Sequence, residues 1–203
     1  GRDLERIRRD DMARQVAVVL TDRVDPGRLT VADVIALGRH PHTGWSGRLG
    51  ASDREAVAVA LEAVGAEELA ERMLWELSDG QRQRVMIARA IAQAPRLLLL
   101  DEPTAFLDPP GRIRVFELLQ DLAYDRGIAV VVCTHDVEVA ARHADRLWVV
   151  GPDDGMRTGV PHALAHDGTL EAAFGGDVGF DPDSYTFVSN RSQPDRGGRQ
   201  GKT

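Results

Sequence analysis

The chain has 203 residues, 43% of them hydrophobic, which is enough for one sizeable core with room for a second small lobe. Its formal net charge of -7 leaves no excess of positive charge for the backbone of nucleic acid or for an anionic membrane surface, so we expect no nucleic-acid partner. The sequence holds no apolar run of the ~18 to 20 residues that a transmembrane helix needs, and we expect a soluble chain. Its polar start runs directly into an apolar segment, which suggests that Gly1 lies within a domain.

The first predicted elements are a strand and a helical lobe. The short apolar run Val16–Leu20 is typical of a strand buried on both faces of a largely parallel sheet. Ser52 and Glu55 then form a capping box, which predicts the start of an amphipathic helix that ends at Gly65. Its apolar stripe consists of Val57, Leu61 and Val64. Residues 52–77 carry helical signals without an intervening strand, so we expect a helical lobe there.

A second capping box opens the next helix. Ser78 and Gln81 form it within the segment Leu77–Gln81, directly before a helical pattern. The apolar stripe of that helix consists of Val85, Ala88, Ile91 and Ala92. Free N–H groups and the dipole at such a helix start favour an anion. Taken alone, the segment is more often an ordinary capped helix.

Two adjacent carboxylates end the next predicted strand, Leu97–Leu100. Because ligands in open α/β sheets lie beyond the carboxyl ends of the strands, we expect Asp101 and Glu102 at a binding edge. Asp101 can hold Mg²⁺, directly or through water, and Glu102 can polarise a water molecule for attack on phosphorus. The alternative is a buried strand that runs into a solvated turn, and the two residues alone favour neither interpretation.

The following helix is predicted from about Pro110 to Arg126, with Gly127 ending it. The apolar run Ile128–Cys133 predicts a further strand and places the single cysteine inside it, as a packed and reduced thiol. His135 would leave the sheet at the edge of the two carboxylates, where it could bond a γ-phosphate. A lone histidine after a strand is more often a solvated or capping residue.

One more strand of the same largely parallel sheet is predicted at Leu147–Val150. Strands that alternate with helices favour an α/β architecture. Residues 189–203 are polar, rich in Gly, Arg and Gln, and without apolar periodicity, so we expect a disordered tail.

Together, these segments resemble four motifs of ABC-transporter ATPases, in that family's order. They are Leu77–Gln81 for the signature, Leu97–Glu102 for Walker B, Phe106–Asp108 for the D-loop and His135 for the switch histidine. The similarity spans about Met12 to Phe187. It implies an N-terminally truncated ABC ATPase domain over 1–188, with a P-loop NTPase-like α/β parallel-sheet core and a helical signature subdomain at about 30–92.

The resemblance also implies a composite nucleotide site. In this family two ATPase subunits form a head-to-tail dimer, with ATP and Mg²⁺ as cofactors, and the signature contacts the γ-phosphate of ATP that the partner holds. The implied site residues are Glu102 and His135 for catalysis, Asp101 for the metal, and Ser78, Gly80, Gln81 and Asp108 for the nucleotide.

A subfamily is indicated by Thr30–Val34 and Leu37–Trp45, which are similar to the corresponding part of ATPases that import iron–siderophore, haem and cobalamin complexes. This implies transmembrane permease subunits as partners, a substrate-binding protein as an indirect one, and a peripheral place on the cytoplasmic face of the cell membrane. His40 and His42 alone could suggest a metal site. Because no carboxylate or cysteine cluster lies nearby in the sequence, a solvated loop is the better interpretation, and the same holds for His162 and His166.

The sequence departs from the family at the phosphate-binding loop, G-x-x-x-x-G-K-[ST], whose amides and lysine cradle phosphates. Nothing ahead of Val16 offers it. The only lysine is Lys202, in Gly201-Lys202-Thr203, where Arg196 stands in place of the first glycine, and we interpret this as a chance match. Two explanations stay open, a fragment of a working ATPase and a naturally short protein, and the retained motif residues favour the first.

Two smaller departures concern single residues. Thr21 stands where the Q-loop of the family usually has a glutamine that touches Mg²⁺ and the transmembrane partner. Asp79 replaces a signature glycine, and its charge should weaken anion binding unless the side chain turns outward to cap the helix or to pair with Arg82.

Three functions therefore remain in competition. The first is the energising ATPase of an importer, and the second is a non-hydrolytic interaction subunit that supplies only its signature face to a partner. The third is a chromosome-maintenance or DNA-repair ATPase, against which the acidic charge and the absence of a long heptad arm both count.

Overall fold

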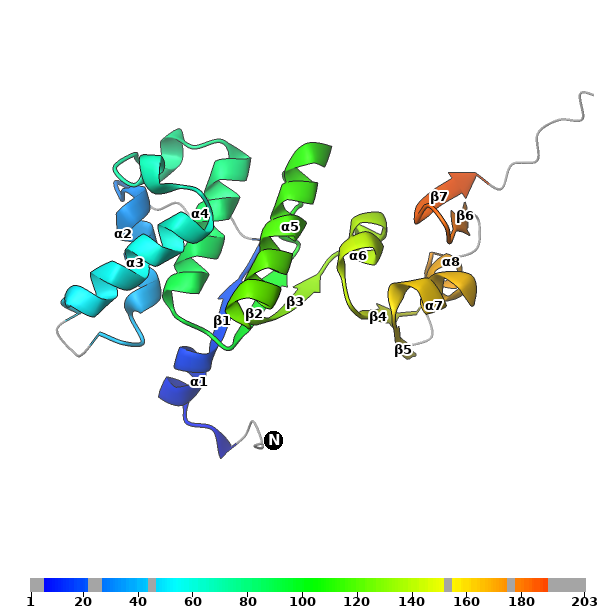
Figure 1. The fold of residues 1–203 in the computed structure, drawn as a ribbon, viewed down its shortest axis with the longest axis horizontal. Helices are drawn as coiled ribbons and strands as arrows, with labels where there is room; N and C mark the ends of the chain where they lie inside the picture. Colours follow the sequence, from blue (N-terminus) through cyan, green and yellow to red (C-terminus); the bar gives the residue numbers. More distant parts are fainter. Residues whose placement is uncertain (1–5, 22–26, 44–46, 152–154, 175–177, 190–203) are drawn as a thin grey trace, which may run out of the picture. The chain divides into compact units, whose positions relative to one another are not determined.

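The computed structural model describes residues 6–21, 27–43, 47–151, 155–174 and 178–189 (Figure 1). The predicted tail beyond Ser189, with Lys202, and the end of the subfamily segment at Trp45 lie outside the described residues. The chain divides into two compact units, Gly1–His135 and Asp136–Thr203. Within the described ranges, no helix is both long enough and apolar enough to cross a bilayer.

A three-stranded parallel sheet forms the centre of the first unit. Its order is β1-β2-β3, with β1 at Val16–Val19, β2 at Leu97–Asp101 and β3 at Ala129–Cys133. The prediction of a parallel-sheet core is confirmed. Strand β1 is not buried on both faces, however, because Ala17 and Val19 are buried whereas Val18, between them, is 44% exposed. Cys133 lies at the exposed end of β3, so the prediction of a packed thiol is wrong.

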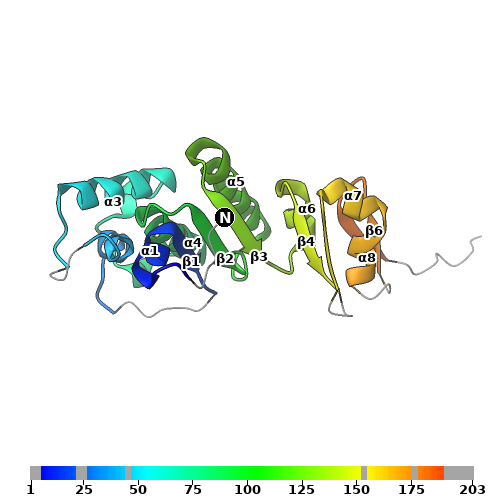
Figure 2. The same cartoon turned by 90° about the horizontal axis from the view of Figure 1, so that it is seen from below.

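Helices of the first unit pack on this sheet and form a lobe beside it. The helical elements are α1 (Arg9–Gln15), α2 (Val31–Ala36), η2 (Leu37–Arg39), α3 (Ala51–Ala63), η3 (Glu67–Leu69), η4 (Leu74–Glu76), α4 (Asp79–Ala92) and α5 (Pro109–Arg126). Helix α4 packs against α2, α3 and β1, and α3 lies beside α4 in Figure 2. The buried side chains of α2, α3, α4, α5 and the sheet belong to one core.

The helix boundaries follow local signals, with one correction. Helix α3 begins after Gly50, whose N–H donates to the carboxylate of Asp53, so Ser52 and Glu55 do not form the cap that we predicted. The apolar stripe of α3 is buried as predicted, and Gly65 follows the helix with a φ of +58°, a conformation that favours glycine. Gly127 ends α5 in the same way, with a φ of +64°.

The second unit is small and mixed. It contains α6 (Val137–His143), β4 (Leu147–Val150), β5 (Met156–Gly159), α7 (Pro161–His166), α8 (Thr169–Ala173), β6 (Val178–Asp181) and β7 (Thr186–Ser189). Its core consists of Ala141, Leu164, Ala165, Leu170 and Phe180. Strand β4 pairs antiparallel with β5, so the prediction that it joins a parallel sheet is wrong. The hairpin closes through the Gly151 N–H, which donates to the carbonyl of Gly155, and an apolar run alone does not specify the partner of a strand.

The core of the first unit makes a testable prediction. Leu98 is fully buried in the central strand, so Leu98→Ala should lower the free energy of unfolding by about 2–5 kcal/mol, measured by chemical denaturation. Val18→Ala is the matched control on the neighbouring strand, where the partly exposed side chain should cost much less. Equal losses for the two variants would contradict the assigned burial.

Candidate functional site

Three parallel strands end at one edge of the sheet and bring polar side chains together there. Asp101 is the last residue of β2 and lies opposite Cys133 of β3 in the register. Glu102 follows Asp101, His135 follows β3 by two residues, and Thr21 follows β1 by two residues. We call Thr21, Asp101, Glu102 and His135 the acidic edge.

The carboxylate of Glu102 is held by the residues that follow β3. One of its oxygens, Oε1, accepts a hydrogen bond from the backbone N–H of His135 at 2.9 Å and lies 2.8 Å from the ring nitrogen Nδ1 of His135. The other, Oε2, accepts a longer bond of 3.4 Å from the hydroxyl of Thr134. The predicted neighbourhood of Glu102 and His135 is thus a direct contact.

The backbone at Glu102 is strained to make this contact. Its φ is +46°, in the left-handed region that a residue with a side chain enters at a cost of roughly 1–2 kcal/mol. The N–H of Glu102 donates to the carbonyl of Cys133 at 2.8 Å, which ties this conformation to β3. Strain of this kind persists only where surrounding bonds over-determine it, and such positions gather at functional sites.

Thr21 has a role that the sequence did not reveal. Its hydroxyl donates to the backbone carbonyl of Asp101 at 2.9 Å and lies 3.3 Å from the carboxylate oxygen Oδ2. The residue that replaces the expected glutamine therefore links the ends of β1 and β2. Eighty positions separate the two residues in the chain, so no local pattern could have shown the bond.

The signature segment begins α4 as predicted. Ser78 is the N-cap, its hydroxyl oxygen accepts from the N–H of Gln81 at 3.3 Å, and the Gln81 side chain accepts from the N–H of Ser78 at 3.1 Å. The helix N-terminus therefore presents further N–H groups and a positive dipole end. A hollow joins the start of α4 to the acidic edge, with Asp79, Arg82, Glu102 and Thr21 among its lining residues.

Several predicted site residues do not line this hollow. Ser78 and Gln81 are absent from its lining in the described structure, so it brings Asp79, and not the capping pair, to Glu102. Asp108 caps α5 by accepting from the N–H of Gly111 at 3.0 Å. A Cβ at Gly111 would lie 2.5 Å from that carboxylate, which explains the glycine.

The histidines outside the edge form no metal centre among the described residues, where no group of three or more His, Cys, Asp and Glu side chains could hold an ion. His40 is exposed, whereas His42 is half-buried and its Nε2 lies 2.8 Å from the carbonyl of Gln93. The interpretation as a solvated loop is therefore wrong for His42. His162 and His166 are exposed but belong to helix α7, so the loop interpretation is wrong for them, and their rings stack with the centroids 4.0 Å apart.

Comparisons with known proteins point to one family. The family described as ABC transporter matches residues 1–105. An ABC transporter ATP-binding protein of Methanocaldococcus jannaschii is 44% identical over 79% of this chain and 56% of its own length. The cobalamin import ATP-binding protein of Halobacterium salinarum is 39% identical over 97% of this chain and 49% of its own. The achromobactin transport ATP-binding protein of Dickeya dadantii is 34% identical over 91% of this chain and 69% of its own.

A solved structure of the same family also matches this chain. A metal-chelate type ABC transporter in an inward-facing conformation matches 79% of this chain and 63% of its own with a TM-score of 0.74 at 31% identity. The chain thus spans about half the length of the first curated relatives that it matches.

The thiol at the acidic edge offers a test of its electrostatics. Although Cys133 is an exposed residue, partial desolvation raises the pKa of its thiol, and the carboxylates of Asp101 and Glu102 raise it further. Because the thiolate is the reactive form, Asp101→Asn should lower this pKa and increase the rate of alkylation by iodoacetamide near pH 8. Asp125→Asn, at the far end of α5, is the control and should leave the rate unchanged. An unchanged or slower reaction of Asp101→Asn would contradict the assigned contact.

Proposed function

This chain belongs to the ABC transporter family, and we propose that it is the ATP-binding and ATP-hydrolysing subunit that energises an importer for iron–siderophore, haem or cobalamin-type complexes. Because these 203 residues contain no phosphate-binding loop ahead of Val16, we expect no hydrolysis by them alone. The observation that carries the proposal is the direct contact of Glu102 with His135 at a sheet edge beside Asp101. The names of the cobalamin and achromobactin relatives support the class of cargo.

The acidic edge has oxygen ligands of the kind that a nucleotide-bound magnesium ion needs. Mg²⁺ prefers oxygen ligands and is commonly held by one or two carboxylates together with phosphates. Asp101 supplies a carboxylate, and Thr21 places a hydroxyl oxygen next to it. We infer that Asp101 would hold Mg²⁺ and that Thr21 would fix the carboxylate. The ion, when bound, supplies positive charge that neutralises the phosphate oxygens.

Glu102 is the proposed general base. Its carboxylate can accept a proton from a water molecule that attacks phosphorus, and the two bonds from His135 and Thr134 hold it at the end of β2. His135 is proposed to hydrogen-bond the γ-phosphate and to lose this bond when the phosphate leaves. Its Nδ1 faces Glu102, so its other ring nitrogen is the atom that can reach a phosphate oxygen.

The signature end of α4 serves a second copy in this proposal. Ser78, Gly80 and Gln81 stand at a helix N-terminus, where N–H groups and the dipole favour a phosphate. The capping pair lies outside the lining of the hollow at Glu102, which agrees with a head-to-tail dimer in which this end contacts the nucleotide of the partner. Asp108, at the start of α5, would lie near the dimer contact.

The remaining partners follow from the family. We propose transmembrane permease subunits, a substrate-binding protein that acts through them, and a peripheral position on the cytoplasmic face of the membrane. The alternative is a non-hydrolytic subunit that contributes only its signature face to a partner ATPase. The two differ in whether the chain's own Glu102 matters for turnover.

ATP turnover by the protein assembled with its transporter partners tests the proposal. Glu102→Gln should lower kcat by about 100- to 10,000-fold, the usual contribution of a general base, while the protein still retains nucleotide. The matched control is Glu117→Gln, the same change at an exposed position of α5, which should turn over at the parental rate.

Two outcomes would count against the proposal. Parental turnover in Glu102→Gln would exclude Glu102 as the base. If turnover were parental in Glu102→Gln but slowed in Ser78→Ala, this chain would contribute only its signature end to a partner's nucleotide site. The non-hydrolytic alternative would then hold.

A further inference from the structure

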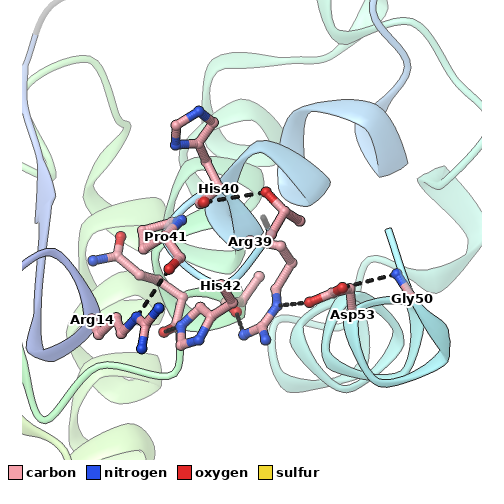
Figure 3. A network of polar contacts seen from close by, with 10 residues as sticks. Arg14, Arg39, His40, Pro41, His42, Gly50 and Asp53 are labelled. Atoms are coloured by element: carbon pink, nitrogen blue, oxygen red, sulfur yellow. Dashed lines mark hydrogen bonds and ion pairs between the residues drawn. The ribbon is translucent and has the colours of Figure 1, made fainter. Parts of the chain in front are cut away.

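A buried ion pair lies in the helical lobe, away from the acidic edge. Arg39 and Asp53 are the only charged residues among the buried ones that the structure describes, with exposures of 8% and 7%. The Nε of Arg39 donates to Oδ1 of Asp53 at 2.9 Å, and the N–H of Gly50 donates to the other carboxylate oxygen (Figure 3). These two donors hold the pKa of Asp53 below its usual range. Burying charges is unfavourable for stability unless every charged group is bonded. The other contacts of this pair therefore bear on its role.

The same arginine binds the end of the signature helix. Nη1 of Arg39 donates to the carbonyl of Ala92, the last residue of α4, at 2.6 Å. His42 lies with Nε2 2.8 Å from the next carbonyl, that of Gln93. The last carbonyls of a helix lack partners within it and carry its negative dipole end, so a guanidinium there is favourable.

Close backbone contact accompanies these bonds. A Cβ added to Gly38 would lie 2.0 Å from the carbonyl oxygen of Arg89, one turn before the end of α4. Only glycine allows this approach without displacing backbone. The segment Gly38–His42 therefore rests directly on the last turn of α4, and we call it the helix clamp.

The clamp and the helix end are also tied to the sheet. The side-chain amide of Gln93 donates to the carbonyl of Val16 at 2.7 Å, where β1 begins, and also to the carbonyl of Ala13. Arg14, in the last turn of α1, donates from Nε to the carbonyl of Pro41 at 3.0 Å (Figure 3). One end of α4 is thus fixed to the strand whose other end carries Thr21.

We propose that Arg39 and His42 are positioning residues, which fix the last turn of α4 on the sheet and thereby set where its signature end lies relative to the acidic edge. The proposal rests on the proposed function for the role of that end. Helix α4 has 14 residues and so is about 21 Å long. A tilt of roughly 5° at the clamp would move Ser78 by about 2 Å, and displacements of about 1 Å can cost a hundredfold in rate.

Distance measurements on the chain test the clamp without nucleotide. Spin labels are placed on Cys133, at the exposed end of β3, and on Trp75→Cys, an exposed position three residues before Ser78. We expect one narrow distance distribution in the parent. Arg39→Lys should broaden or shift this distribution, because a single ammonium group cannot replace the planar guanidinium that bonds both Asp53 and Ala92. His42→Ala should have the same effect.

Two controls separate positioning from general stability. Leu69→Ala removes a buried side chain of the same lobe outside the clamp and should leave the distribution unchanged. His42→Gln retains an N–H donor for the carbonyl of Gln93 and should restore the parental distribution. Parental distributions in Arg39→Lys and His42→Ala, or equal broadening in Leu69→Ala, would overturn the proposal.

Turnover then connects the clamp to function. In the assembled transporter, His42→Ala should lower kcat roughly 10- to 100-fold with the KM for ATP unchanged, because a displaced signature end weakens contacts to the reacting phosphate. A parental kcat together with an altered distance would overturn the positioning role. Absence of turnover in the parent itself would refute the proposed function, and the distance measurement would still decide whether the clamp holds α4.

Discussion

The register of three parallel strands is the constraint on which the site depends. Strand β2 pairs with β1 on one side and with β3 on the other, so Asp101 ends beside Cys133 and the polar residues after each strand meet at one edge. A shift by one residue would turn every side chain of a strand to the opposite face. The buried face of β2 holds the register. The strained backbone of Glu102 is stable because its N–H donates to Cys133 at the end of β3 and its carboxylate accepts from the N–H of His135, two residues further on.

Helix α4 connects this edge to the lobe. Its first turn carries the signature residues, and its last turn contacts Arg39 and His42. A single helix therefore spans the distance between the signature residues and the start of β1. The side chain of Arg84 ties the middle of α4 to the end of α3, through the carbonyls of Val64 and Gly65. The helices of the lobe are thus joined to α4 along its length, and α4 itself packs against β1.

Local signals account for what the sequence predicted. The apolar runs located β1, β2 and β3, the capping box located the start of α4, and the carboxylates after β2 were found because strand ends in parallel sheets share an edge. Contacts between distant residues escaped prediction. Thr21 and Asp101 are 80 positions apart, and Arg39 and Ala92 are 53 apart. The antiparallel partner of β4 and the exposure of Cys133 escaped for the same reason, because both depend on which segments meet in space.

A structure of the Glu102→Gln variant of the assembled protein with Mg·ATP would test the central claim most directly. The quantity to measure is the position of the γ-phosphate relative to residue 102 and His135 of one copy and to Ser78, Gly80 and Gln81 of the other. The account predicts one nucleotide between these two sets, with Asp101 beside the metal ion. A nucleotide bound away from residue 102, or a dimer in which the signature end of α4 faces away from the phosphate, would contradict it.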